Sequence, residues 1–272
     1  MSNNSSASKT QITLPPLPYR LGVECVAGVL SAFSVAPAIS IVDKAIVSNA
    51  SGLEPLLPCM INGIKSLFTN PLAFLRQPSF LFIWGVYSGT YIVANSTEAI
   101  CEYKNKAPFY PKFLASSFAN VTLSVLKDKA FARMFGVGAA KPLPARSYAL
   151  FATRDSMTIL ASFSLPGPLS LMMQERCACT PLFADNMAQL FTPVTMQIFS
   201  APLHLHGLDL YNRGGALSVS DRIDFIKQEY VKTTLARMAR IFPAFGIGGV
   251  LNKFIRQQGI TRLQGEFAQT AH

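Results

Sequence analysis

The most informative run in the chain is PSFLFIWGVYSGTYIVANST, residues Pro78–Thr97, which holds 20 residues without an Asp, Glu, Lys or Arg. Two further runs of this kind are Ser156–Gln174, with 19 residues, and Asn186–Leu208, with 23. A helix needs about 20 mostly apolar residues to cross the hydrocarbon core of a bilayer. The three runs therefore predict membrane-spanning helices. Their Ser, Thr, Asn, Gly and Pro content favours helices that pack on one another.

The composition of the whole chain agrees with a membrane protein. Half of the 272 residues are hydrophobic, 14% are charged and the mean hydropathy is +0.31. A soluble domain carries about 25% charged residues, so the chain has roughly half that share. Intrinsic disorder is excluded because it needs low hydrophobicity and high charge. Five cysteines are too few for a disulfide scaffold. A large, very apolar soluble helical protein remains the alternative.

Six apolar segments are longer than ordinary strands and are interpreted as helices. They cover residues 19–47, 78–101, 109–131, 147–173, 186–211 and 235–255. The predicted fold is all-α, with six transmembrane helices arranged as three two-helix repeats with short connecting helices. The expected organisation is a flexible polar tail at 1–18, a membrane domain at 19–256 with repeats at about 19–104, 105–175 and 180–256, and a second tail at 257–272.

Basic residues are distributed unevenly between the segments. Counted with the adjoining segment ends, as residues 48–77, 127–146 and 209–240, the connections after the first, third and fifth segments hold thirteen Lys and Arg. Those after the second and fourth, counted in the same way, hold four, namely Lys104, Lys106, Lys112 and Arg176. Such an excess marks the loops on one side of a membrane. It supports an even number of spans, with both termini on the less basic side. The net charge of +10 is spread between apolar segments, which argues against a nucleic-acid-binding protein with its cations in one stripe.

Prolines and charge clusters recur along the chain. Pro37 and Pro202 lie late in the first and fifth segments, while Pro78 and Pro243 open the second and sixth, and each pair is 165 residues apart. We expect these prolines to kink the helices, and the spacing predicts a threefold internal repeat. Each odd segment ends in an acid with a nearby base, at Asp43 and Lys44, at Asp128 and Lys129, and at Asp209 and Arg213.

These features resemble the mitochondrial carrier family, whose odd helices carry a proline followed by an acid and a base. PAISIVDK (Pro37–Lys44) and APLHLHGLDLYNR (Ala201–Arg213) are similar to that motif. RMARIFPAFGIGGVLNKFIR (Arg237–Arg256) is similar to the sixth helix of the family. The resemblance covers residues 19–256. It implies three helix pairs around a central cavity in a mitochondrial membrane, with the inner membrane favoured over the outer.

Charged residues within the apolar segments need partners, because an isolated charge at the centre of a bilayer costs about 2.5–3.5 kcal/mol. Sequence neighbours do not face each other on a helix, so the partners are expected on other helices. We hypothesise a gate formed by a ring of ion pairs at the basic side. The pairs are Asp43 with Lys129, Asp128 with Arg213, and Asp209 with Lys44. The alternative is that these charges lie at the membrane interface and contribute little.

Arg154 and Asp155 are the candidates for contact with a ligand, because uncharged residues flank them on both sides. An arginine can bind a carboxylate or a phosphate through two parallel hydrogen bonds. The same arginine could instead lock its helix to the second or sixth segment. Ligand binding and structural pairing therefore both remain open.

No catalytic or metal-binding motif stands out, so no enzyme activity, cofactor or metal is predicted. His204 and His206 are two residues apart and point about 200° away from each other on a helix. That spacing is poor for zinc, whose ligands converge tetrahedrally. Cys177 and Cys179 lack a second pair of ligands.

Two functions are compatible with these patterns. The first is a carrier-like membrane protein that moves a small anionic solute by alternating access, with Arg154 holding the anion. The second is a carrier-fold scaffold or accessory subunit that binds other mitochondrial membrane proteins. In a transporter, one water-accessible space should be lined by Asp43, Lys129, Arg154 and Asp155. In a scaffold, that space could be filled by Phe82, Trp84 and Phe245.

Overall fold

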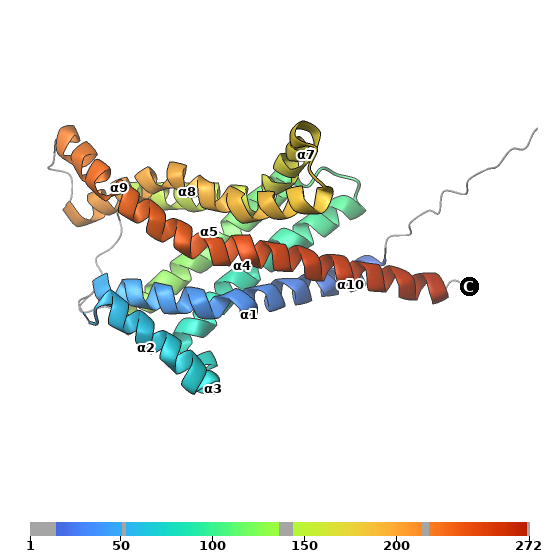
Figure 1. The fold of residues 1–272 in the computed structure, drawn as a ribbon, viewed down its shortest axis with the longest axis horizontal. Helices are drawn as coiled ribbons and strands as arrows, with labels where there is room; N and C mark the ends of the chain where they lie inside the picture. The colour runs from blue at the N-terminus through green and yellow to red at the C-terminus, as the bar shows by residue number, and fades with distance from the viewer. Residues whose placement is uncertain (1–14, 51–52, 136–143, 214–217, 271–272) are drawn as a thin grey trace, which may run out of the picture.

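The computed structural model describes residues 15–50, 53–135, 144–213 and 218–270, and every regular element in these residues is a helix (Figure 1). The prediction of an all-α protein is confirmed. The elements are α1 (Leu17–Ala50), α2 (Leu56–Thr69), α3 (Pro71–Leu75), α4 (Pro78–Tyr103), α5 (Phe109–Phe135), α6 (Ala145–Ile159), η1 (Leu160–Ser164), α7 (Pro166–Cys177), α8 (Pro181–Arg213), α9 (Val219–Ile241), η2 (Phe242–Ile247) and α10 (Gly248–Thr270). The two η elements are short π-helical segments.

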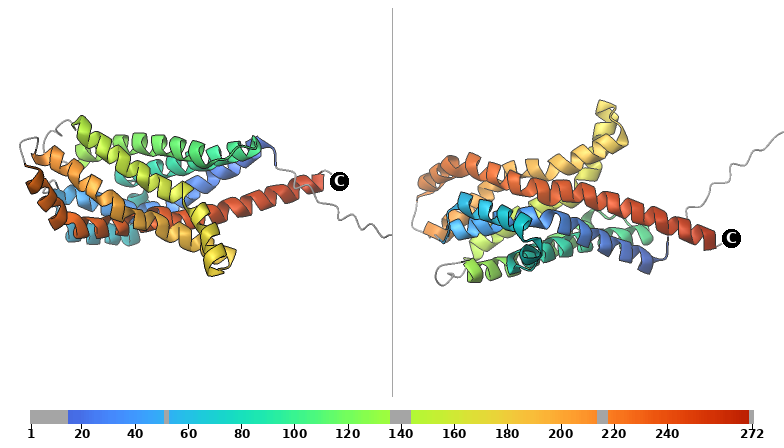
Figure 2. Two further views of the ribbon diagram at one scale, coloured as in Figure 1. Left: turned by 90° about the horizontal axis from the view of Figure 1, so that it is seen from above. Right: turned by 60° about the horizontal axis from the view of Figure 1, so that its bottom comes forward.

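The long helices close into a ring. α1 packs on α4, α4 on α5, α5 on α6 and α6 on α8. The ring is completed by η2, which packs on α8, and by α10, which packs on α1. The helices run roughly along the long axis of the molecule, and α7 projects sideways from it (Figure 2). One side of each long helix therefore faces a common interior.

The two ends of the ring are different. We call the end at which α1, α5 and α8 finish, near Ala50, Phe135 and Arg213, the basic end. The opposite end, at which α1 begins and α10 finishes, is called the terminal end (Figure 1). There the rings of Tyr19 and Phe267 lie 5.3 Å apart. The first and last described helices therefore meet at one end of the molecule.

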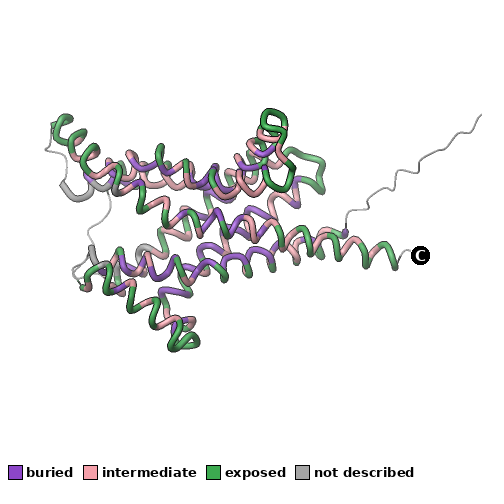
Figure 3. Tube along the Cα trace, in the orientation of Figure 1, coloured by how far each residue is buried: buried purple, intermediate pink, exposed green. Residues whose placement is uncertain are grey.

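Polar side chains are buried inside the ring together with an apolar cluster, while many other large apolar side chains are exposed on the outside. Glu24, Asn95 and Gln197 are at most 1% exposed, whereas Phe118 is 77% and Phe199 66% exposed. Burial is greatest along the middle of the ring, while α2, α7, α9 and the far end of α10 are mostly exposed or intermediate (Figure 3). An apolar exterior around a polar interior is the arrangement expected of helices that contact lipid outside and line a polar space inside.

One described helix is long and apolar enough to cross a bilayer, namely Leu17–Ser48 of α1, with a mean hydropathy of 2.1. Ala145–Ser164 and Pro166–Cys177 meet the same criterion only when taken together, and the chain bends by 52° between them. The prediction of six transmembrane helices in three repeats is therefore not confirmed. The other long helices combine an apolar outer face with the polar residues of the ring interior, and this mixture lowers their mean hydropathy.

The four prolines expected to kink helices lie in three different settings. Pro37 and Pro202 lie inside α1 and α8, which continue past them. Pro243 lies in η2, where the helix that begins at Val219 changes to π-type bonding and then continues as α10. A proline lacks the N–H that α-helical bonding requires, so a change of pattern there is understandable. The expectation for Pro78 is wrong, because this residue is the first of α4 and begins a helix instead of bending one.

The expected domain boundaries remain predictions. Most of the predicted N-terminal tail, residues 1–14, lies outside the described residues. In the predicted C-terminal tail, residues 257–272, α10 continues as far as Thr270.

The packing of α1 on α4 can be tested at Gly28. A Cβ atom added there would lie 3.0 Å from the backbone nitrogen of Ile92 in α4. We expect Gly28→Ala to lower the melting temperature, because a helix backbone cannot move aside locally and overpacking costs about 1–3 kcal/mol. Gly85→Ala is the matched control, since no atom lies within 4 Å of its added Cβ. Thermal unfolding in detergent measures both variants, and equal effects would contradict the close approach of the two helices.

Candidate functional site

A cavity of about 410 Å³ lies inside the ring, in the half nearer the basic end, and is called the basic cavity. Described side chains from α1, α4, α5, α6, α8, α9 and η2 line it, so every part of the ring except α10 contributes. Its volume lies in the range of about 300–1,000 Å³ that is usual for small-molecule sites. The charged residues that line it, in the part of the chain that the structure describes, are Asp43, Lys127, Arg154, Asp155, Arg237 and Arg240.

Asp43 connects three helices at this cavity. Its carboxylate accepts a hydrogen bond from Nζ of Lys127 in α5, at 3.1 Å, and one from Nη1 of Arg240 in α9, at 3.0 Å. Asp43 is only 4% exposed, so little water compensates its charge. A buried carboxylate is tolerated when cations and hydrogen bonds replace its hydration. The contacts of Asp43 therefore hold α1, α5 and α9 together.

Arg154 and Asp155 bind each other through two hydrogen bonds, from Nε to Oδ1 at 2.9 Å and from Nη2 to Oδ2 at 2.7 Å. This corrects the expectation that sequence neighbours cannot pair, because the arginine side chain is long enough to curl back to the next residue. Nη1 of Arg154 lies 2.7 Å from Nδ1 of His204. Arginine can only donate, so Nδ1 accepts and the imidazole is neutral, with its proton on Nε2.

Arg237 differs from the other cations of the cavity. Its Nη2 donates to Oε1 of Gln197 at 2.7 Å and to Oγ of Ser200 at 3.4 Å. Its Nε is buried and has no hydrogen-bond partner. Among the described residues that line the basic cavity, Arg237 is the cation whose hydrogen bonds reach only neutral oxygens. An unsatisfied buried donor costs about 1–3 kcal/mol, so the guanidinium of Arg237 has hydrogen-bonding capacity that the described residues leave unsatisfied.

The charges of the basic cavity do not balance. Among the described residues, four cations and two carboxylates line it, and His204 is neutral, so this described lining has two more positive than negative charges. Coulomb interactions are stronger in a partly buried cavity than in water, because the effective dielectric constant is lower. The lining therefore attracts a negatively charged group and disfavours an additional positive charge.

The remaining residues of the hypothetical gate are placed differently. Asp209 is 1% exposed and binds Arg222 of α9, where Lys44 was the expected partner. Nζ of Lys44 instead lies 5.7 Å from the ring centroid of Phe135. Three side chains lie outside the described residues, those of Asp128, Lys129 and Arg213. The pairs that involve them remain predictions.

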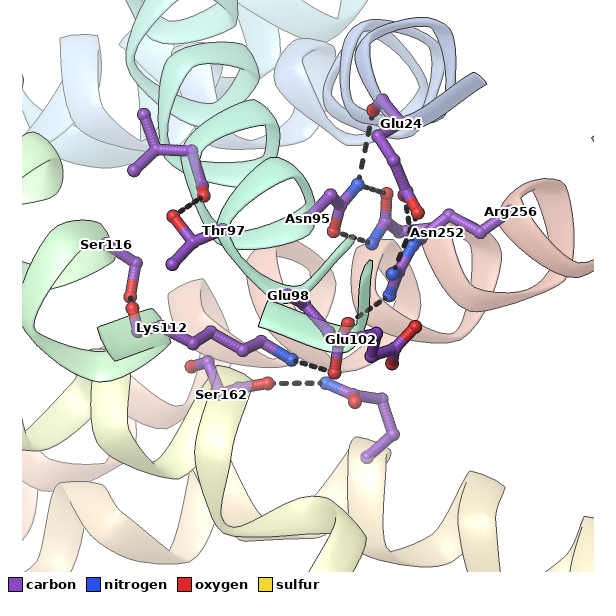
Figure 4. A network of polar contacts seen from close by, with 12 residues as sticks. Glu24, Asn95, Thr97, Glu98, Glu102, Lys112, Ser116, Ser162, Asn252 and Arg256 are labelled. Carbon is purple, nitrogen blue, oxygen red and sulfur yellow. Dashed lines mark hydrogen bonds and ion pairs between the residues drawn. The ribbon is translucent and has the colours of Figure 1, made fainter. Parts of the chain in front are cut away.

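A second cavity, of about 330 Å³, lies nearer the terminal end and is called the terminal cavity. A network of charged side chains connects the helices around it (Figure 4). Arg256 of α10 binds Glu24 of α1 and also Glu98 of α4, the latter at 2.6 Å. Glu98 is also 3.0 Å from Nζ of Lys112 in α5. Two carboxylates thus face two cations across four helices.

Further polar pairs complete this end of the ring. The side-chain amides of Asn95 and Asn252 exchange two hydrogen bonds, each of 2.9 Å (Figure 4). Nζ of Lys253 lies 2.6 Å from Oδ2 of Asp185. Each described cation that lines the terminal cavity therefore contacts a carboxylate, in contrast to Arg237 in the basic cavity.

The described residues contain no group of three or more His, Cys, Asp or Glu placed to hold a metal ion. Cys177 and Cys179 are free thiols. His204 contacts Arg154 and the ring of Phe151, whose centroid is 5.6 Å from its own.

Sequence reasoning counted Lys127, Arg237 and Arg240 with the basic connections, although they also lie near the ends of the third and sixth apolar segments, and it therefore missed them as cavity residues. In the structure they lie within α5 and α9. The missed signal is a polar stripe at helical spacing, such as Asn120, Ser124 and Lys127. The spacing of four and three residues places these side chains on one face.

The role of Asp43 can be tested by removing its charge. We expect Asp43→Asn to lower the free energy of unfolding by about 3–5 kcal/mol, because Lys127 and Arg240 then lose a buried counter-charge. Asp224→Asn is the control, since Asp224 lies 3.9 Å from Lys227 and both side chains are more than half exposed. An exposed pair of this kind contributes less than about 1 kcal/mol. Denaturant unfolding in detergent measures both, and equal losses would contradict the role given to Asp43.

Comparison with known proteins adds one finding. A family model described as a probable citrulline exporter matches residues 27–260. No curated protein and no solved structure matches the chain.

The family match overturns the resemblance to the mitochondrial carriers. That resemblance rested on prolines and charge clusters, but the acids lie six residues after Pro37 and seven after Pro202. Kinked helices with charged ends can arise in any polar-lined helical membrane protein, so the pattern was not specific. The mitochondrial location rested on the same resemblance and has no support from the family found. A family of exporters confirms that the chain is not an enzyme. With residues 27–260 matched, the chain belongs to the probable citrulline exporter family, a family of membrane transporters.

Proposed function

We propose that the chain exports citrulline, or a closely similar neutral amino acid, and that the basic cavity is its binding site. The observation that carries this proposal is Arg237, whose hydrogen bonds reach only neutral oxygens and whose buried Nε lacks a partner. Citrulline is a zwitterion with a carboxylate, an ammonium group and an uncharged ureido group. The cavity lining has a complementary group for each of the three.

The carboxylate is matched by Arg237. A guanidinium binds a carboxylate through two parallel, charge-assisted hydrogen bonds, which are about twice as strong as neutral ones. The other cations of the lining already contact carboxylates, since Arg154 pairs with Asp155 and both Lys127 and Arg240 contact Asp43. Arg237 is therefore the group that gains most from an added carboxylate.

The ammonium and ureido groups are matched by other parts of the lining. Asp155 is the more accessible carboxylate, with a side chain 19% exposed against 5% for Asp43. We assign the ammonium group to Asp155. The amide of Asn120 and the hydroxyl of Thr158 also line the cavity. They can exchange hydrogen bonds with an uncharged ureido group.

The charge surplus of the cavity supports discrimination between citrulline and arginine. The two amino acids have similar shapes, but the arginine side chain adds a positive charge. The lining already has two surplus positive charges. Placing a further cation there is unfavourable, and such repulsion is a common source of specificity.

The geometry favours transport over the scaffold alternative. Of the four residues expected to line one space in a transporter, Asp43, Arg154 and Asp155 line the basic cavity, while the side chain of Lys129 lies outside the described residues. Of the residues that a scaffold would use to fill it, Phe82 is 39% exposed on the outside and Trp84 stacks on other rings. Phe245 borders the cavity without filling it.

Export can be measured as efflux of labelled citrulline from liposomes that contain the purified protein. We expect saturable efflux, with arginine competing at least about tenfold more weakly, which corresponds to about 1.4 kcal/mol. Arginine is expected to compete more weakly because its side chain adds a positive charge to a cavity lining that already has surplus positive charge. Absence of citrulline efflux from folded protein would contradict the function, and equal competition by arginine would contradict the charge argument.

The carboxylate contact can be tested with Arg237→Gln. We expect at least about a tenfold rise in the half-saturating citrulline concentration, because a charge-assisted pair becomes a neutral hydrogen bond. Arg262→Gln is the matched control, since Arg262 is exposed on α10, away from both cavities. An unchanged half-saturating concentration in Arg237→Gln, or an equal rise in the control, would show that Arg237 does not bind the solute.

A further inference from the structure

Four aromatic rings separate the basic cavity from the terminal cavity. Tyr87 and Phe245 line the basic cavity, while Tyr91 and Phe163 line the terminal cavity. The centroid of Phe245 is 5.3 Å from that of Tyr87, 5.6 Å from Phe163 and 6.1 Å from Tyr91. The centroids of Tyr91 and Phe163 are 5.2 Å apart. The four rings therefore form one contacting layer, called the aromatic layer, with a cavity on each side.

The aromatic layer is held by hydrogen bonds to the two π-helical segments. Nε2 of Gln189 donates to the carbonyl of Ser162 in η1, at 3.1 Å, and to that of Phe245 in η2, at 3.0 Å. The hydroxyl of Tyr91 donates to the carbonyl of Ala244, at 2.9 Å. π-Helical segments occur frequently at functional sites. Here one glutamine of α8 connects both of them at the level of the rings.

Two glycines allow these contacts. A Cβ atom added at Gly248 would lie 2.7 Å from the hydroxyl of Tyr91, and one added at Gly249 would collide with the amide of Gln189. Both glycines lie at the start of α10, directly after η2. The tyrosine and the glutamine can therefore approach the backbone of this segment closely only because it carries no side chain there.

We propose that the terminal cavity is the second half of the solute's path, that it opens on the opposite side of the membrane from the basic cavity, and that the aromatic layer closes the path between them. The identity of the solute, a neutral amino acid, rests on the proposed export function. The opening of the two cavities on opposite sides of the membrane is argued from the geometry alone. The ring of Phe245 contacts each of the other three rings of the aromatic layer, so the solute must displace Phe245 to pass between the cavities.

The charges of the two cavities predict that the basic cavity binds the solute more tightly than the terminal cavity does. In the basic cavity, the hydrogen bonds of Arg237 reach no carboxylate among the described residues, so an amino acid carboxylate would gain a new ion pair there. In the terminal cavity, Lys112, Lys253 and Arg256 already contact carboxylates. A zwitterion gains less by entering a balanced network, since each new ion pair must replace an existing one. The terminal cavity therefore suits release of the solute more than its capture.

The test is cysteine accessibility, which does not need a transported solute. The five natural cysteines, at 25, 59, 101, 177 and 179, are replaced by Ala. Single cysteines are then introduced by Ser124→Cys, in the lining of the basic cavity, and by Gly167→Cys, in that of the terminal cavity. Gly167 has no atom within 4 Å of an added Cβ, and Ser124→Cys changes a single atom. A third protein that retains only the exposed Cys177 marks the side of the terminal end.

Each protein is placed in sealed vesicles in one orientation and treated with a membrane-impermeant maleimide from one side or the other. We expect the cysteine at 167 to react from the same side as Cys177, and the cysteine at 124 to react from the opposite side only. If the cysteines at 124 and 167 both react from the same side, or if neither reacts from any side, the proposal that the two cavities open on opposite sides of the membrane is wrong.

The aromatic layer is tested by adding Phe245→Ala to the protein with a cysteine at 167. We expect this cysteine to become reactive from both sides, because the ring shared by the layer is gone. Phe80→Ala is the matched control, since Phe80 is a buried ring of the same size, 1% exposed, that contacts Phe33, Phe74 and Trp84 outside the layer. If Phe245→Ala keeps one-sided reaction, or if Phe80→Ala also abolishes it, the aromatic layer is not the barrier.

The outcome separates this inference from the proposed function. Opposite-side labelling without citrulline efflux would uphold the path and reject citrulline as its solute. Citrulline efflux with same-side labelling would uphold the function and reject the path described here.

Discussion

Charged side chains inside a ring of helices need an opposite charge beside them, and this constraint determines how the ring is held together. At the terminal end, Arg256 of α10 contacts Glu24 of α1 and Glu98 of α4, and Lys112 brings α5 into the same network. At the basic end, Asp43 of α1 accepts hydrogen bonds from Lys127 of α5 and Arg240 of α9 and so connects these three helices. Buried apolar side chains such as Phe80, Phe131 and Ile159 also pack between the helices, and the ion pairs add specific contacts to this packing inside the ring.

The same constraint explains where a solute can bind. A network in which each charge has a partner connects the helices, but a charged ligand gains little binding free energy from it because it must break existing ion pairs. The basic cavity departs from this balance at Arg237, whose guanidinium contacts only neutral oxygens. An amino acid carboxylate restores the balance, and an uncharged side chain does not disturb it. The membership of the chain in a family of probable citrulline exporters agrees with this chemistry.

The sequence predicted the helical class and some of the cavity residues, but not their partners. Long uncharged runs predicted the helices. Arg154 and Asp155 were selected as candidate ligand contacts because uncharged residues flank them on both sides. The partners of Asp43 could not be found, because Lys127 and Arg240 are 84 and 197 residues away in the chain. The balance of the ion pairs depends on which helices become neighbours. The family assignment failed because prolines and terminal charges are shared by unrelated polar-lined bundles.

The most direct measurement of the central claim is an experimental structure of the protein with citrulline bound. The account predicts the amino acid in the basic cavity, with its carboxylate on the guanidinium of Arg237 and its ammonium group near Asp155. Citrulline bound elsewhere in the protein, or held in this cavity with its carboxylate away from Arg237, would contradict it.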